Sequence, residues 1–197
     1  MADEINAQAS ASKFKPHPEG TLAAVCVDVI DLGKKVDEWQ GTTRILPKCA
    51  LVFMTGKINA ETGEHHDVSI EHTVSMGDKA NLRRFLESWR GKKYTEDQAQ
   101  KGVPIHKLVG QSGLITVEHH QSKQGRTYAR ILSVSPLPEG LLAPTLPEYK
   151  RASFWEERKK AYADELAKHI AASRPTDAGD NFDDFPPSDD DSTEMPF

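Results

Sequence analysis

The sequence predicts a mainly β protein with five strands, one helix between the third and fourth strands, and a second helix after the fifth. Three observations support this fold class. Five segments have the pattern of strands, and in 21–33 and 66–75 apolar and polar residues alternate with a period of two, which is the period of a strand. The period changes twice to that of a helix. The final segment, 181–197, is acidic and contains three prolines, which favours disorder.

The five strand-like segments are 21–33, 44–56, 66–75, 113–120 and 126–134. In the first of them Val25, Val27 and Val29 share one face, because side chains alternate across a strand. The polar segment 34–43 contains a glycine and predicts a loop. The last two strands are joined by a short polar segment with Gly125 near its turn, which indicates a hairpin.

The first helix is expected within residues 77–91. Its apolar residues recur at i, i+3, i+4 and i+7, and they are Leu82, Phe85, Leu86 and Trp89. Asp78 has the side chain of an N-cap, and Gly91 is suited to end the helix. Thr95 is expected to cap one more short turn.

The second helix is expected at 153–174, where Ser153 and Glu156 have the spacing of a capping box. Its less polar face is formed by Trp155, Arg158, Tyr162, Leu166 and Ile170.

Three strands, a helix and two strands are the element order of the OB-fold, a five-stranded Greek-key barrel. SH3-like and other small barrels share much of this pattern. The expected organisation is a flexible arm at 1–12, the OB-fold domain at 13–138, a proline-rich linker at 139–152, the helix at 153–174, and a disordered acidic tail at 175–197.

Charge is divided unevenly along the chain. The formal net charge is −5, but residues 175–197 hold eight acids and neither Lys nor Arg. Within 79–130 there are eleven bases against four acids. An acidic tail on a locally basic body indicates a polyanionic partner.

The usual motifs of catalysis and metal binding are missing from the sequence. There is no Cys-x-x-Cys, no His-x-x-x-His, no phosphate-binding glycine loop and no Gly-x-Ser-x-Gly. Cys26 and Cys49 lie in apolar strand-like runs and are expected to be buried free thiols, as in a reducing cytoplasm. No run approaches the length of a membrane span. We therefore expect neither an enzyme nor a membrane protein, and no cofactor or metal.

A single-strand binding surface is better supported, because such surfaces combine cations along the phosphates with rings that stack on bases. Trp39, in a polar segment, is expected to stack, Phe53 and Trp89 are expected in the core, and Tyr128 suits either place. The candidate DNA-binding residues are Lys34, Lys35, Trp39, Arg44, Lys48, Lys57, Arg90, Lys92, Lys93, Tyr94, Lys123, Arg126, Tyr128 and Arg130.

Two parts of the sequence resemble known families. The segments LRRFLESWRGKKYTEDQ, LVGQSGLITVEH and GRTYARILSVSPLP are similar to a bacteriophage family of OB-fold single-stranded DNA-binding proteins, over about 14–138. The end, DDFPPSDDDSTEMPF, resembles the acidic C-terminal tip of bacterial single-stranded DNA-binding proteins. The helix around Trp155 departs from the bacterial pattern, in which a longer flexible linker leads to the tip.

The resemblance implies a phage protein that coats and protects single-stranded DNA in replication, recombination or repair, in the cytoplasm of an infected bacterium. It implies that the tail recruits replication or recombination proteins through Asp189, Asp190, Asp191, Met195, Pro196 and Phe197. Two alternatives stay open: a strand-annealing mediator, and an OB-fold adaptor that binds protein and mimics DNA with its tail. The sequence also leaves open whether the chain forms a homo-oligomer.

Overall fold

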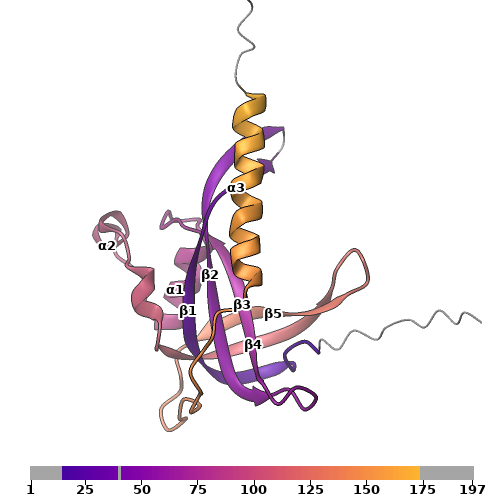
Figure 1. The fold of residues 1–197 in the computed structure, drawn as a ribbon. Helices are drawn as coiled ribbons and strands as arrows, with labels where there is room; N and C mark the ends of the chain where they lie inside the picture. The colour runs from indigo at the N-terminus through magenta and orange to yellow at the C-terminus, as the bar shows by residue number, and fades with distance from the viewer. Residues whose placement is uncertain (1–14, 40, 174–197) are drawn as a thin grey trace, which may run out of the picture.

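The computed structural model describes residues 15–39 and 41–173, and of Trp39 only the backbone. Its five strands are β1 (Gly20–Trp39), β2 (Thr42–Ile58), β3 (His65–Thr73), β4 (Ser112–Gln121) and β5 (Thr127–Ser135). They form one antiparallel sheet in the order β3-β2-β1-β4-β5 (Figure 1). The helices are α1 (Asn81–Arg90), α2 (Glu96–Lys101) and α3 (Phe154–Ala172), with a 3-10 turn η1 (Ile105–Leu108). The predicted fold class, mainly β with a helix after the third strand, is confirmed.

The inner layer of the protein is the core between the concave face of the sheet and α1. Every residue of the predicted apolar stripe of α1 is buried there. The ring of Trp89 lies 5.1 Å from that of Phe53, which is fully buried. The indole Nε1 of Trp89 donates to the Ser112 carbonyl over 2.8 Å. Gly113 makes this approach possible, because a Cβ at that position would lie 2.5 Å from the same nitrogen.

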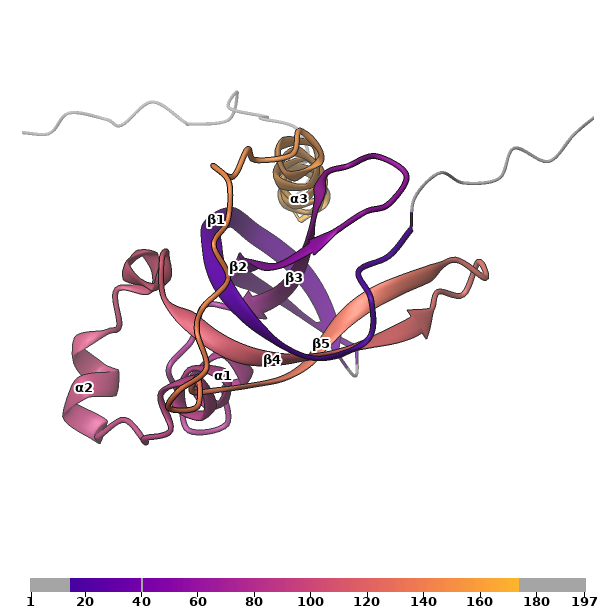
Figure 2. The ribbon, with the colours of Figure 1, turned by 90° about the horizontal axis from the view of Figure 1, so that it is seen from below.

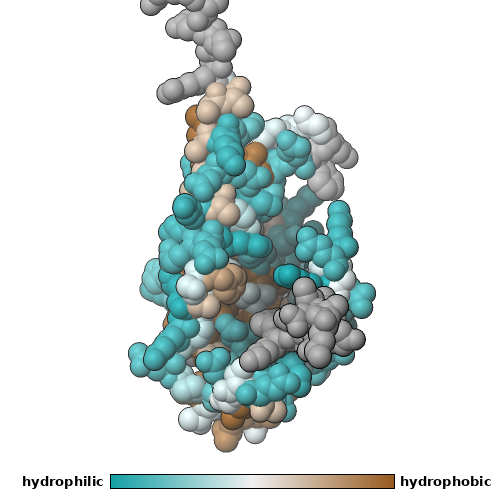
Figure 3. All heavy atoms as spheres, turned by 45° about the vertical axis from the view of Figure 1, so that its right-hand side comes forward, coloured by the Kyte–Doolittle hydropathy of each residue, from teal (hydrophilic) through white to brown (hydrophobic). Residues whose placement is uncertain are grey.

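The outer layer is α3, packed on the opposite face of β1 and β2 (Figure 2). Trp155 and Tyr162 are its buried residues, and they cover Ile30, Leu32 and their neighbours Ala50 and Val52. Residues 49–55 of β2 are therefore buried on both faces, which explains why this part of the strand is almost continuously apolar rather than alternating. The face of the molecule seen in Figure 3 is mostly hydrophilic, with smaller apolar patches between the polar side chains.

Polar side chains at Arg151, just before α3, and in the first half of α3 also hold this outer layer to the sheet. The Arg151 guanidinium donates two hydrogen bonds to the Asp28 carboxylate, at 2.7 and 2.8 Å. On β3, Glu71 accepts from Arg158 at 2.9 Å and from the Tyr162 hydroxyl at 2.8 Å. The helix is thus held by two buried rings and by carboxylates of the sheet.

Some local predictions were wrong. Residues 34–39 continue β1 as a two-stranded ribbon with β2 instead of forming a loop. Asp78 does not cap α1, because its carboxylate is bound by Arg83 at 2.6 Å and the N-cap is Ala80. Ser153 stands at the N-cap of α3, but its side chain makes no capping hydrogen bond.

Other local predictions were confirmed. Thr95 and Gln98 form a capping box at α2. Cys26 and Cys49 are free and buried, and burial raises the pKa of their thiols to about 12 and about 11. In the described ranges, none of the helices has the length and apolar character needed to cross a membrane.

Candidate nucleic-acid interface

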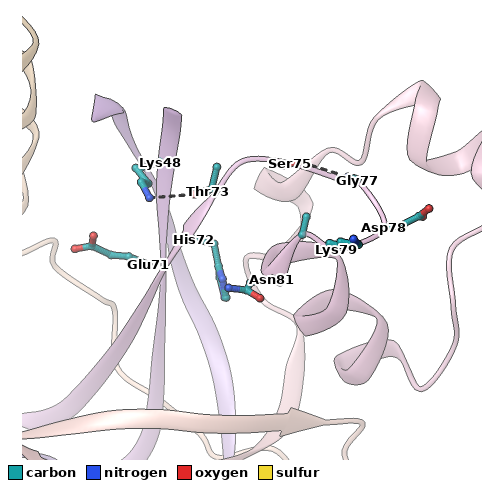
Figure 4. A pocket seen from close by; sticks show the side chains of 10 residues that line it. Lys48, Glu71, His72, Thr73, Ser75, Gly77, Asp78, Lys79 and Asn81 are labelled. Carbon is teal, nitrogen blue, oxygen red and sulfur yellow. Dashed lines mark hydrogen bonds between the residues drawn. The ribbon is translucent and has the colours of Figure 1, made fainter. Parts of the chain in front are cut away.

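A groove runs between β3 and β5, the two strands at the edges of the sheet, beside α1. It consists of two adjoining hollows of about 680 and 790 Å³. They have Glu71, His72 and Asn81 in common. Figure 4 shows the first hollow, in which His72 and Glu71 point to opposite sides of β3.

Three exposed cations line the groove without a carboxylate within 4.0 Å among the described residues. They are Lys79 before α1, Arg84 on α1 and Arg130 on β5. Two further cations of the groove are engaged: Arg158 with Glu71 at 2.8 Å, and Lys48 with Asp37 at 2.8 Å. The lining therefore keeps three positive charges available for phosphate groups, which bind Lys and Arg in this way.

An exposed aromatic ring stands at the end of the groove on the β4–β5 hairpin. Tyr128 is 43% exposed, and its ring lies 6.1 Å from that of His120 across the two strands, tilted by 34°. Leu132, further along β5, is also exposed. In proteins that bind single strands, bases stack on exposed rings of this kind while neighbouring cations bind the phosphates.

The floor of the groove contains a neutral histidine. His72 is buried against Phe85, with ring centroids 4.9 Å apart. Burial lowers its pKa to about 4, so the ring is uncharged at neutral pH. Its Nε2 has no hydrogen-bond partner among the described residues. His72 therefore contributes shape and not charge to the groove.

Of the predicted DNA-binding residues, the groove brings together Lys48, Tyr128 and Arg130. Asp37 binds Lys48 and also Lys35, at 3.0 Å. The pKa of Asp37 is lowered, chiefly by its hydrogen bonds with Lys48 and then Lys35. These two lysines are consequently poorer phosphate ligands than their sequence context indicates.

The remaining predicted residues lie in separate places. Lys34 and Arg44 are on the β1–β2 ribbon, and Lys123 and Arg126 are at the turn of the β4–β5 hairpin. Lys57 lies near the end of β2, on the same side of the molecule as His17. The basic group at the end of α1 does not line the groove; it consists of Arg90, the last residue of the helix, and of Lys92, Lys93 and Tyr94 after it. The Trp39 side chain and the tail residues 189–191 and 195–197 lie outside what the structure describes.

Sequence reasoning missed Lys79, Arg84 and Arg158 as lining residues. The excess of bases in 79–130 was the one signal that included the first two. Within the described ranges, no group of three or more His, Cys, Asp or Glu side chains is arranged to hold a metal ion. No protein-family model matches the chain, and no curated protein is significantly similar to it.

Proposed function

We propose that this protein binds single-stranded DNA without strong sequence preference, as a coating protein and not as an enzyme. The observation that carries the proposal is the β3–β5 groove, in which Lys79, Arg84 and Arg130 are free to bind phosphates beside the exposed ring of Tyr128. The OB-fold element order supports the same class of ligand, since such barrels bind oligonucleotides.

The groove favours a single strand over a duplex for a physical reason. Tyr128 presents its ring at the groove, and a ring of this kind can stack only on bases that are not already stacked and paired. The three free cations lie in the turn before α1, on α1 and on β5, so they follow a backbone and do not converge on one phosphate. Binding of this type tolerates sequence, because every base has a face on which to stack.

The proposal is tested by fluorescence anisotropy with labelled oligo-dT and with a matched duplex at several salt concentrations. Arg84→Ala and Arg130→Ala should each weaken binding to oligo-dT and reduce the log–log salt slope by about 0.7, the value for one phosphate contact on a single strand. Tyr128→Ala should cost about 1–3 kcal/mol of binding free energy with little change of slope.

Lys159→Ala is the matched control, because Lys159 is exposed on α3 and lines neither hollow of the groove. Equal affinity for oligo-dT and duplex would contradict the proposal and favour a protein-binding adaptor. Faster pairing of complementary strands in the presence of the protein would identify a strand-annealing mediator.

The acidic segment 175–197 extends the proposal to partners. Its eight acids and its apolar residues Met195 and Phe197 suit a basic, apolar site on a replication or recombination protein of the phage's host. Capture of a purified host replication protein by the full chain, and its loss in Phe197→Ala with DNA binding unchanged, would support this role.

A further inference from the structure

A second concave surface lies on the other side of α1 from the groove. This pocket, of about 350 Å³, is enclosed by the end of α1, the segment before η1, and η1 itself. Its walls are mainly apolar and include Leu86, Trp89, Val103, Pro104 and Leu108. We call it the α1–η1 pocket.

The rim of the α1–η1 pocket is basic. Arg90 and Lys107 line it, and Lys92 and Lys93 follow in the same turn as Arg90, all exposed. The Arg90 guanidinium lies 4.2 Å from the centre of the Tyr94 ring, which holds it at the pocket edge.

Most carboxylates near this rim are already neutralised. Arg83 is buried, and it binds Glu87 at 3.1 Å and Glu96 at 2.8 Å. The Tyr94 backbone N–H also donates to Glu87, at 3.0 Å. Asp97, on α2, is the nearby acid outside this network. The rim cations are therefore left to attract an external anion.

The α1–η1 pocket is separate from the groove. The two have no lining residue in common. Figures 1 and 2 both place α2 on the side of the molecule opposite the tip of the β4–β5 hairpin. A DNA strand in the β3–β5 groove accordingly leaves the basic rim without a ligand. An apolar pocket with a basic rim fits an acidic peptide that carries an aromatic or other large apolar side chain.

We propose that the α1–η1 pocket binds segment 181–197 of the same chain. This segment has six acids, no Lys or Arg, and three phenylalanines. One phenylalanine would occupy the apolar pocket while neighbouring carboxylates pair with Arg90 and Lys107.

The length of the chain permits this binding. The 24 residues after Ser173 can reach roughly 80 Å when extended, at about 3.3–3.6 Å per residue. A domain of this size has a radius of gyration of only about 15 Å. A tethered segment has an effective concentration on the order of millimolar, so even weak affinity for the pocket is sufficient.

The test is paramagnetic relaxation in the full-length, ¹⁵N-labelled chain with a nitroxide attached at Ser192→Cys. Cys26 and Cys49 are buried and have raised pKa values, so the label is directed to the new cysteine. The amides of 90–94, 103 and 105–108 should lose intensity by about half or more, and those of the hairpin residues 120–128, on the opposite side of the molecule (Figures 1 and 2), should not. Losses that are strongest in the hairpin, or none at all, would overturn the proposal.

Two further samples complete the test. The charge reversals Arg90→Glu and Lys107→Glu, made together, should restore the intensities, whereas Lys159→Glu on α3 should not. Mixing ¹⁵N-labelled chains that lack the nitroxide with unlabelled chains that carry it should leave intensities unchanged. Loss in the mixture would mean that the segment comes from a second copy. Since oligo-dT binding is measured separately and depends on the groove, failure of this inference and failure of the proposed function are distinguishable.

Discussion

The inner and outer layers of this protein cover the two faces of strand β2 in different ways. On the inner face of β2, α1 contributes four large apolar side chains that pack against Leu51, Phe53 and residues of the four other strands. On the outer face, α3 contributes Trp155 and Tyr162 over small or branched residues and an ion pair to Glu71, and Arg151, just before the helix, pairs with Asp28. The inner layer is a core shared by α1 and all five strands, whereas the outer layer is formed by α3 on one face of β1 and β2.

Because of this difference, the two layers should unfold differently when a contact is lost. Loss of an inner side chain affects contacts among α1 and several strands at once, so the whole domain should unfold together. Loss of an outer contact affects one helix and one face, so α3 should be able to open while the sheet stays intact. Substitutions in the two layers should distinguish unfolding of the whole domain from opening of α3 alone.

The largest effect is expected for Trp89→Ala. It removes a buried ring and its hydrogen bond to Ser112, and should lower the free energy of unfolding by about 3–5 kcal/mol. Denaturant unfolding followed by circular dichroism and by hydrogen exchange should show the same loss in every strand. Loss of protection confined to α1 would contradict an inner core shared by the helix and the strands.

Acid should weaken the inner layer through His72. Its pKa is about 4 in the folded protein and 6.5 ordinarily, so the unfolded chain takes up a proton first as pH falls. The stability that depends on this group is complete above pH 6.5 and declines toward pH 4, by about 3 kcal/mol in total at 1.36 kcal/mol per pH unit. His17, whose pKa is also lowered, chiefly by burial, acts in the same direction.

Urea unfolding between pH 7 and 4 measures this dependence. His72→Gln should flatten the pH profile, while His106→Gln, at an exposed position, should leave it unchanged. A profile of the same steepness in His72→Gln would assign the acid sensitivity to other groups.

Trp155→Ala should act on the outer layer alone. Because the ring lies between α3 and one face of β1 and β2, its loss should speed hydrogen exchange in α3 by about tenfold or more while the β4 amides keep their protection. Uniformly faster exchange in α3 and β4 would show that the two layers unfold as one unit.

The smallest effect is expected for Glu71→Gln. It weakens the acceptor of Arg158 and Tyr162, and because this site is partly exposed, the cost should be about 1 kcal/mol. Hydrogen exchange of α3 should increase slightly, whereas Glu157→Gln, on an exposed position of the same helix, should have no effect. An effect as large as that of Trp155→Ala would make the ion pairs, and not the rings, the main attachment of α3.

Much of the inner layer could be predicted from the sequence because its signals are local. The i, i+3, i+4, i+7 stripe of α1 and the alternation in 66–75 each report burial directly. The ribbon at 34–39 could not, because Val36 is the one buried residue among 34–38, and polar strands have no apolar period. In α3 the expected face predicted Trp155 and Tyr162 correctly, but Ile170 is exposed, because burial ends with Tyr162.

The groove could be predicted only in part. Tyr128 and Arg130 alternate along one strand and are visible in the sequence. Arg84 and Arg130 are brought to the same groove by the order of strands in the sheet and the packing of α1, which no local pattern encodes. Asp37 shows the reverse case, since its ion pairs with Lys35 and Lys48 remove cations that sequence alone counts as available.

The pairing of β1 also affects the order of events during synthesis. β1 pairs with β4, with Gly20 opposite Val117. β1 therefore lacks this neighbouring strand until most of the described chain has left the ribosome. Until then, β1 can pair only with β2, and its other edge remains open to strands of neighbouring nascent chains. Sheets closed by such distant contacts fold slowly, in milliseconds to seconds. Crowding of nascent chains should therefore lower the yield of native protein.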